Sequence, residues 1–153
     1  MTAIPTARLL CNLMDGMLAV EGGLKSPAGD LYNEFPDRLS DAILLMAFGY
    51  SDVSNPWNVA LGSVAAAGAL MTACIRMHGA SLTGTHDFRG PMAKPQRMAV
   101  LTVASVVLAG LGIAEGNAQV IPLTLGLIAA GCAITCWRRL NALAAILHAR
   151  SKP

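Results

Sequence analysis

Residues 56–77 read PWNVALGSVAAAGALMTACIRM. The stretch is cleanly apolar, and a helix of this length can cross a hydrocarbon core of about 30 Å. Its many Gly and Ala residues are typical of membrane helices, because small side chains let neighbouring helices approach closely. The stretch predicts a transmembrane α-helix and therefore an all-α membrane protein.

The composition of the whole chain agrees with a lipid environment. The 153 residues are 54% hydrophobic and 13% charged, with a mean hydropathy of +0.54. Soluble domains contain about 25% charged residues, so a low charge content favours a single lipid-embedded domain over residues 1–153. The net charge of +2 comes with no dense basic cluster, which excludes nucleic acid as a partner.

Other apolar stretches predict further spans. They are bounded by polar residues, Gly or Pro, and run from Ile4 to Val20, from Leu31 to Tyr50, from Arg97 to Ala114 and from Gln119 to Trp137. A last stretch, from Arg138 to Ala149, has its apolar residues on one face and predicts a short helix on the membrane surface. We therefore expect a polytopic bundle of about five transmembrane helices followed by a surface helix.

The basic residues predict the orientation of these spans. Ten of the eleven lysines and arginines fall in alternate loops and thus on one face of the membrane. The positive-inside rule makes that face cytoplasmic, in the inner or plasma membrane of a bacterium, with the N-terminus outside. The N-terminal stretch lacks the pattern of a removable signal, so we expect none.

The cysteines and histidines show no pattern that indicates chemistry. The cysteines lie within apolar stretches and are interpreted as small packing residues; they are Cys11, Cys74, Cys132 and Cys136. Histidines isolated in polar loops are usually only solvated, and we assign them no role.

Acidic residues in the first two stretches are the strongest functional signal. A charge buried at membrane depth costs at least about 2.5 kcal/mol, so Asp15, Asp37 and Asp41 need compensation. Asn12 and Asp15 are three residues apart and Asp37 and Asp41 are four apart, so each pair lies on one helix face. Two helices that present these faces to each other would bring four oxygen ligands together. Such a set suits Mg²⁺ or Mn²⁺, and we expect two ions.

The neighbours of Asp15 favour a bound diphosphate. Gly16 has no side chain, so a ligand can approach the backbone, and Ala19 keeps the same face shallow. Two divalent ions could hold a diphosphate and stabilise the charge that develops as it is cleaved, while a remaining carboxylate accepts a proton.

Two other interpretations of the carboxylates stay open. Asp37 could pair with Arg38 or Lys25 at the membrane surface, with Asp15 in a wet groove. Intramembrane acids also mark ion pathways, so a small ion-coupled transporter is an alternative function. The lack of a second, inverted copy of the acidic pattern argues against the transporter.

The acidic pattern resembles the signature of the CDP-alcohol phosphotransferases, D-x-x-D-G-x-x-A-R-x8-G-x3-D-x3-D. Residues 12–20 read NLMDGMLAV and residues 37–41 read DRLSD. Asn12 stands where the family has its first aspartate, and Val20 stands where it has the arginine. The resemblance implies a dimeric enzyme with six transmembrane helices, which our five spans match without the first.

Two alignments with the signature are open. Without a gap, Gly29, Asn33 and Asp37 fill its last three positions. With four more residues in the connection, Asn33, Asp37 and Asp41 fill them. We favour the second alignment because it keeps two carboxylates, and four residues are about one helical turn.

The resemblance implies an activity and a set of site residues. The reaction moves a substituted phosphate, of phosphatidyl type, from a CDP-linked lipid to an alcohol or phosphorylated alcohol, releasing CMP, in phospholipid biosynthesis. The implied metal ligands are Asn12, Asp15 and Asp37, the general base is Asp41, and the residues beside the diphosphate are Gly16, Ala19 and Asn33. The alternative is a catalytically weak or inactive relative that binds the CDP-lipid.

Basic residues between positions 75 and 98 extend the resemblance. In relatives with phosphorylated acceptors, residues at this level bind the acceptor phosphate, which makes candidates of Arg76, Arg89, Lys94 and Arg97. They could instead be topology residues that contact anionic membrane lipids.

Overall fold

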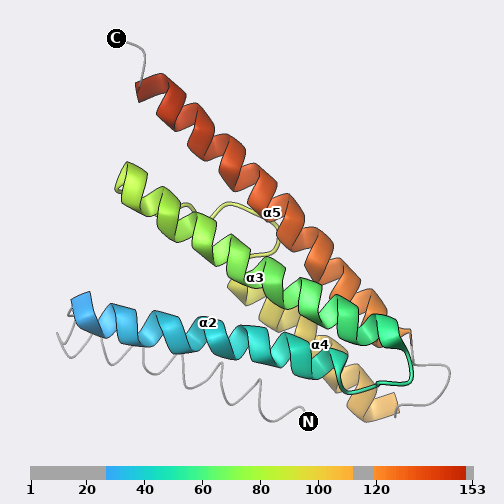
Figure 1. Cartoon of the computed structure of the whole chain (residues 1–153). Helices are drawn as coiled ribbons and strands as arrows, with labels where there is room; N and C mark the ends of the chain where they lie inside the picture. The colour runs from blue at the N-terminus through green and yellow to red at the C-terminus, as the bar shows by residue number, and fades with distance from the viewer. Residues whose placement is uncertain (1–26, 112–118, 151–153) are drawn as a thin grey trace.

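The computed structural model describes residues 27–111 and 119–150, and the side chains of residues 34–110 and 119–150. These residues form four α-helices and no strand: α2 (Pro27–Gly49), α3 (Pro56–Thr83), α4 (Lys94–Leu111) and α5 (Val120–Arg150) (Figure 1). The all-α class is thus confirmed for the part of the chain that is described. The first predicted span, from Ile4 to Val20, lies outside it.

The ends of α3 follow from local chemistry. The side chain of Asn55 caps the N-terminus by accepting a hydrogen bond from the Trp57 backbone N–H at 3.1 Å. Gly84 ends the helix in the left-handed conformation, with a φ of 76°, and its N–H donates to the Ala80 carbonyl at 2.8 Å. The helix therefore continues to Thr83, past the end predicted from hydropathy.

The helix α3 lies at the centre of the arrangement, between α2 and α5, and α4 packs mainly against α5 (Figure 1). The helices α3 and α5 are parallel, because Gly68 lies against Cys132 and Gly79 lies against Leu143. The short turn after Gly49 makes α2 antiparallel to α3. The N-terminal half of α2 therefore lies at the same end of the molecule as the C-terminal halves of α3 and α5.

Small residues set the contact between α2 and α3. A Cβ atom added to Gly49 would lie 2.5 Å from the Asn58 carbonyl oxygen, and one added to Gly62 would lie 3.2 Å from the Gly49 Cα. The two backbones therefore touch, as small residues allow in membrane helices. The core beside this contact combines small residues of α3 with side chains of α2, α4 and α5; its fully buried members are Leu45, Ala65, Ile121, Leu125, Ile128 and Cys132. The packing role predicted for Cys132 is confirmed.

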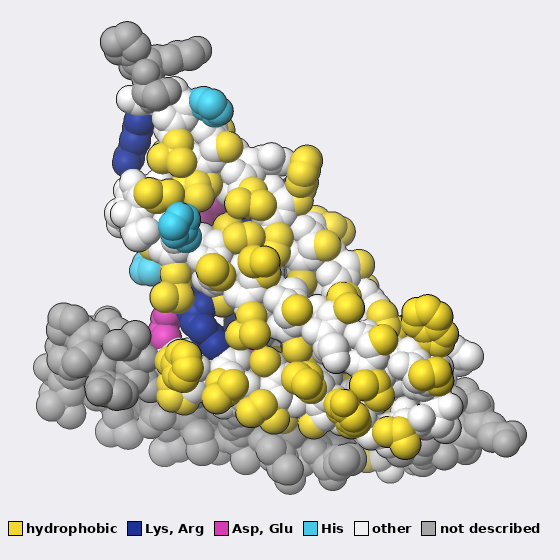
Figure 2. All heavy atoms as spheres, viewed as in Figure 1, with side chains coloured by type: hydrophobic (Ala, Val, Ile, Leu, Met, Phe, Trp, Pro, Cys, Tyr) yellow, Lys and Arg dark blue, Asp and Glu magenta, His cyan; other side chains and the backbone are white. Residues whose placement is uncertain are grey.

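Of the described helices, α3 and α5 have the length and composition to cross a membrane, with mean hydropathies of 1.7 and 1.9 over their most apolar windows. Large apolar side chains are exposed on the outer faces of the bundle, among them Val64, Val103 and Leu123. Figure 2 shows hydrophobic side chains spread over the visible face, with the charged ones gathered toward the left. The five-span arrangement itself stays a prediction.

The separate surface helix predicted from Arg138 to Ala149 is wrong. These residues continue α5 without a break to Arg150. The sequence from Cys132 to Arg150 contains no Gly or Pro, so nothing in the backbone ends the helix where its composition changes.

Candidate functional site

A cavity of about 280 Å³ lies between the N-terminal half of α2, the middle of α3 and the start of α4; we call it the carboxylate cavity. It brings together five of the predicted site residues: Asp37, Asp41, Arg76, Lys94 and Arg97. Since these residues come from three helices, their convergence is a property of the fold.

The two aspartates of α2 face two basic residues of α4. Lys94 Nζ contacts a carboxylate oxygen of Asp37, and Arg97 Nη2 lies 3.8 Å from Asp41 Oδ2. Both members of the second pair are only 4% exposed. Asp37 and Asp41 are four residues apart on α2, and Lys94 and Arg97 are three apart on α4, so each helix presents its two charged side chains on one face. Asp37 therefore lies opposite Lys94, and Asp41 lies opposite Arg97.

Arg97 is fixed in place by further contacts. Its Nη1 donates to Thr72 Oγ1 at 3.0 Å and to the Met92 carbonyl at 3.1 Å. Its Nε is buried and has no hydrogen-bond partner among the described residues. These contacts fix the Arg97 guanidinium beside Asp41.

Glu34 and Arg76 join α2 to α3 at the mouth of this cavity. The Glu34 carboxylate accepts hydrogen bonds from Arg38 at 2.6 Å and from Arg76 at 2.8 Å. The Arg76 guanidinium carbon also lies 5.4 Å from the centre of the Phe88 ring, within the range of a cation–π contact. Arg76 is therefore held between α2 and the segment that precedes α4.

Arg139 is a site residue that the sequence analysis missed. It is buried, its Nη1 donates to the Thr72 carbonyl at 2.8 Å, and its Nε donates to the Arg89 carbonyl at 2.9 Å. The sequence does contain a signal for it. Arg139 continues the i, i+3/i+4 spacing of the buried residues of α5, four positions after the buried Thr135.

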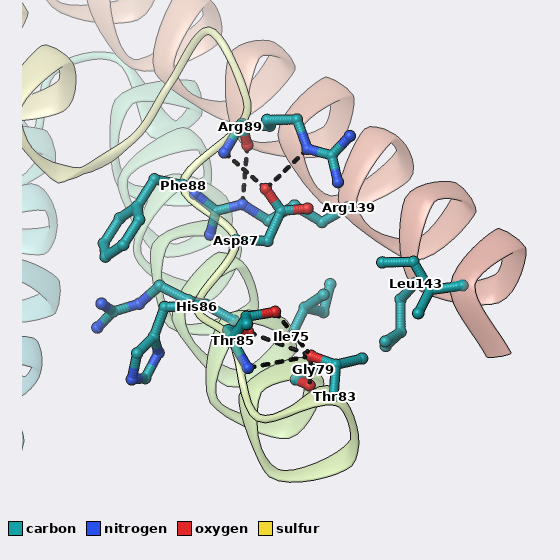
Figure 3. Close-up of a pocket in the computed structure, with 12 residues that line it drawn as sticks. Ile75, Gly79, Thr83, Thr85, His86, Asp87, Phe88, Arg89, Arg139 and Leu143 are labelled. Carbon is teal, nitrogen blue, oxygen red and sulfur yellow. Dashed lines mark hydrogen bonds and ion pairs between the residues drawn. The ribbon is translucent and has the colours of Figure 1, made fainter. Parts of the chain in front are cut away.

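A second cavity, of about 520 Å³, lies between the C-terminal halves of α3 and α5 and the segment 84–93; we call it the outer cavity (Figure 3). Arg76, Phe88 and Arg139 line both cavities and form the wall between them. Arg89, the fourth predicted acceptor contact, lines the outer cavity and not the carboxylate cavity.

Asp87 orders the polar side of the outer cavity. Its carboxylate accepts hydrogen bonds from the Arg89 backbone N–H at 2.9 Å and from Arg89 Nε at 3.0 Å (Figure 3). Partial burial raises the pKa of Asp87, but the hydrogen bonds and charge of Arg89, helped by the charge of Arg139, outweigh it and lower the pKa below its usual value. The Asp87 to Arg89 ion pair therefore persists at neutral pH.

The remaining predicted ligands lie where the structure gives no side chain. Asn12, Asp15, Gly16 and Ala19 are outside the described residues, and Asn33 lies in α2 without a described side chain. Both alignments of the acidic motif therefore stay predictions.

The described part of the site fits a divalent cation in its chemistry. Asp37 and Asp41 supply carboxylate oxygens to one cavity, and oxygen is the ligand that Mg²⁺ and Mn²⁺ prefer. Lys94 contacts one oxygen of Asp37, Oδ2, so this ion pair would compete with a cation for the carboxylate. Within the described residues, no group of three His, Cys, Asp or Glu side chains forms a metal site, so further ligands would have to come from elsewhere in the chain.

Comparison of the chain with protein-family models, curated proteins and solved structures finds no match. The assignment of a function therefore depends on the residues of the site.

Proposed function

We propose that this chain is a membrane-embedded phosphotransferase, which moves a phosphatidyl-type group from a CDP-linked lipid to an alcohol and releases CMP. The observation that carries the proposal is the meeting of Asp37 and Asp41 with Arg76, Lys94 and Arg97 in one cavity. Carboxylates suit metal binding and proton transfer, and basic side chains suit phosphates, so the cavity has partners for both halves of such a reaction.

The residues of the cavity have separable tasks. Asp41 takes the proton from the acceptor hydroxyl, whose oxygen forms a bond to the phosphorus that carries the lipid. The bond from that phosphorus to the bridging oxygen of CMP breaks, and CMP leaves with the electron pair. Arg97, fixed beside Asp41, supplies a counter-charge, and Arg76 and Lys94 bind the phosphate of a phosphorylated acceptor.

In the proposed enzyme, Asp37 would hold the metal, with Asn12 and Asp15 as further ligands. Mg²⁺ or Mn²⁺ held by these residues would supply positive charge to offset that of the diphosphate and of the leaving CMP. Lys94 contacts Asp37, so cation binding and the freeing of Lys94 for an acceptor phosphate are coupled in this proposal. The protein acts as a homodimer with its active site toward the cytoplasm.

A second candidate is a CDP-lipid binder without turnover. The ion pairs favour it, because Asp37 and Asp41 are both paired with basic side chains of α4. Asn12 and Val20 favour it as well, since neither supplies the charge found in the family signature.

The test uses purified protein in lipid nanodiscs with radiolabelled CDP-diacylglycerol, Mg²⁺ and a panel of alcohols and phosphorylated alcohols. We expect CMP release, and we expect Asp41→Asn to slow it by about 10²- to 10⁴-fold, the usual effect of removing a general base. Asp52→Asn is the matched control, because Asp52 lies in the turn between α2 and α3, at the other end of the bundle.

The outcomes separate the candidates. No CMP release by the unmutated protein, together with Mg²⁺-dependent binding of CDP-diacylglycerol, would select the binder. Equal losses in Asp41→Asn and Asp52→Asn would remove Asp41 from catalysis, and absence of both turnover and binding would reject both candidates.

A further inference from the structure

We propose that the outer cavity binds the headgroup of an anionic phospholipid, with the phosphate at Arg89 and Arg139 and the upper acyl chain against Leu143 and Ile146. The site is separate from the carboxylate cavity. The inference rests on the membrane location of the proposed function and not on its catalytic step.

The lengths of α3 and α5 place the outer cavity at headgroup depth. From Pro56 to Arg76 a helix rises about 30 Å, and from Val120 to Arg139 it rises nearly as far, roughly the thickness of the hydrocarbon core. Both helices continue beyond these arginines, to Thr83 and Arg150.

The side chain of Trp137 supports the same depth. It is 68% exposed and lies half a turn before Arg139 on α5. Exposed tryptophans concentrate at the boundary between acyl chains and headgroups. The cavity that begins at Arg139 and continues to Ile146 therefore lies on the headgroup side of this boundary.

The charge of the cavity suits an anion. Arg76, Arg89 and Arg139 line it, and Asp87 is the carboxylate that opposes them. Asp87 offsets the charge of Arg89, and Glu34, outside the cavity, offsets that of Arg76, so the charge of Arg139 remains in excess in the lining. The Arg89 side chain is 69% exposed, and its guanidinium can therefore reach a phosphate that enters from the membrane.

The apolar side of the cavity favours a lipid over a small soluble phosphate. Ile75, Leu143 and Ile146 line the part formed by α3 and α5. A small phosphorylated alcohol has little apolar surface to bury there, whereas the first carbons of an acyl chain are apolar and gain free energy when they are removed from water. Arg150 donates to the carbonyls of Leu82 and Thr83 at 3.2 Å, which holds the ends of the two helices together around the cavity.

The experiment measures binding of fluorescent phosphatidylglycerol and phosphatidylcholine to the purified full chain in detergent micelles. We expect phosphatidylglycerol to bind at least about tenfold more tightly. Arg89→Gln should weaken its binding by about fivefold, the effect of roughly 1 kcal/mol for one basic residue near a membrane surface. Ile146→Asn should weaken binding of both lipids, because it makes the apolar side polar.

The matched control is Arg138→Gln, which removes the same charge from an exposed position outside the cavity, one residue from Arg139. The affinity of Arg138→Gln for phosphatidylglycerol should differ from that of the unmutated protein by less than about twofold. Arg89→Lys keeps the charge and should retain most of the binding, which would assign the loss in Arg89→Gln to the missing charge.

Three results would overturn the inference: equal losses in Arg89→Gln and Arg138→Gln, equal affinity for the two lipids, and displacement of phosphatidylglycerol by an equal concentration of glycerol 3-phosphate. Asp41→Asn separates this inference from the proposed enzyme. We expect it to retain phosphatidylglycerol binding while losing CMP release, so either property can fail without the other.

Discussion

At the scale of single residues, Arg139 is the side chain on which the site depends. Its guanidinium bonds the carbonyl of Thr72 in α3 and the carbonyl of Arg89 in the segment before α4, from a buried position on α5. It also forms part of the wall between the two cavities. Arg139 thus helps to hold the segment that leads into Lys94 and Arg97, together with Thr135, whose Oγ1 accepts a hydrogen bond from the Met92 N–H.

Replacing Arg139 should destabilise the protein. Arg139→Leu removes the hydrogen bonds to the Thr72 and Arg89 carbonyls, and a lost hydrogen bond from a charged donor costs about 1.5–3 kcal/mol. We expect the unfolding temperature in detergent to fall by roughly 5 °C or more, measured by differential scanning fluorimetry. Arg138→Leu, at the exposed neighbouring position, should leave it nearly unchanged, and an equal fall in both variants would contradict the role of Arg139.

At the scale of elements, the contact between α2 and α3 decides how the acidic face of α2 meets the basic residues. The backbones touch at Gly49 and Gly62, near the turn that joins the helices. From there α2 runs back along α3, so Glu34 comes within 2.8 Å of Arg76. A change in the distance between α2 and α3 at these glycines should therefore also change the distance between the two helices at the site.

Adding one methyl group at this contact should separate the helices. Gly49→Ala places a Cβ atom 2.5 Å from the Asn58 carbonyl oxygen, closer than real contacts allow, and overpacking of this kind costs about 1–3 kcal/mol. Gly126→Ala is the matched control, because a Cβ atom there has no neighbour within 4 Å and alanine favours the helix.

We expect the unfolding temperatures of the two variants to differ. The unfolding temperature should fall in Gly49→Ala and should stay the same or rise in Gly126→Ala. A neutral Gly49→Ala would show that α2 and α3 are not held at this distance.

At the scale of the whole molecule, charge divides the bundle into two ends. One end of the bundle holds the N-terminal part of α2, the C-terminal parts of α3 and α5, and the segment and first turn of α4 beside them. Every lysine and arginine among the described residues lies at this end: Arg38, Arg76, Arg89, Lys94, Arg97, Arg138, Arg139 and Arg150. The turn between α2 and α3 carries Asp52 and no basic residue. Such a division matches a bundle whose basic end lies in the cytoplasm.

Cysteine labelling in intact bacterial cells tests this orientation. With the native cysteines replaced, Ser54→Cys in the turn between α2 and α3 should react with a membrane-impermeant maleimide. Thr85→Cys, in the segment at the basic end, should react only after the cells are permeabilised; both positions are exposed. The reverse pattern would invert the orientation, and labelling of both only after permeabilisation would show that α3 does not cross the membrane.

The sequence by itself determined the helices and the residue types of the site. Apolar stretches predicted α3 and the apolar part of α5, and the spacing of Asp37 and Asp41 placed both on one face of α2. These properties depend on neighbours within a few residues, and helix formation and side-chain direction are local. The separate surface helix was wrong because polarity changes at Trp137, but the backbone has no reason to end there.

Only the tertiary structure decided which charges meet. Lys94 with Asp37, Arg76 with Glu34 and Arg139 with the Thr72 carbonyl join residues more than forty positions apart. It also divided the predicted acceptor contacts between two cavities. These pairings depend on the distance between neighbouring helices and on their relative height, that is, their positions along the helix axis. Contacts of small residues such as Gly49 and Gly62 set both quantities. No local pattern encodes that height, and the packing of the complete bundle determines it.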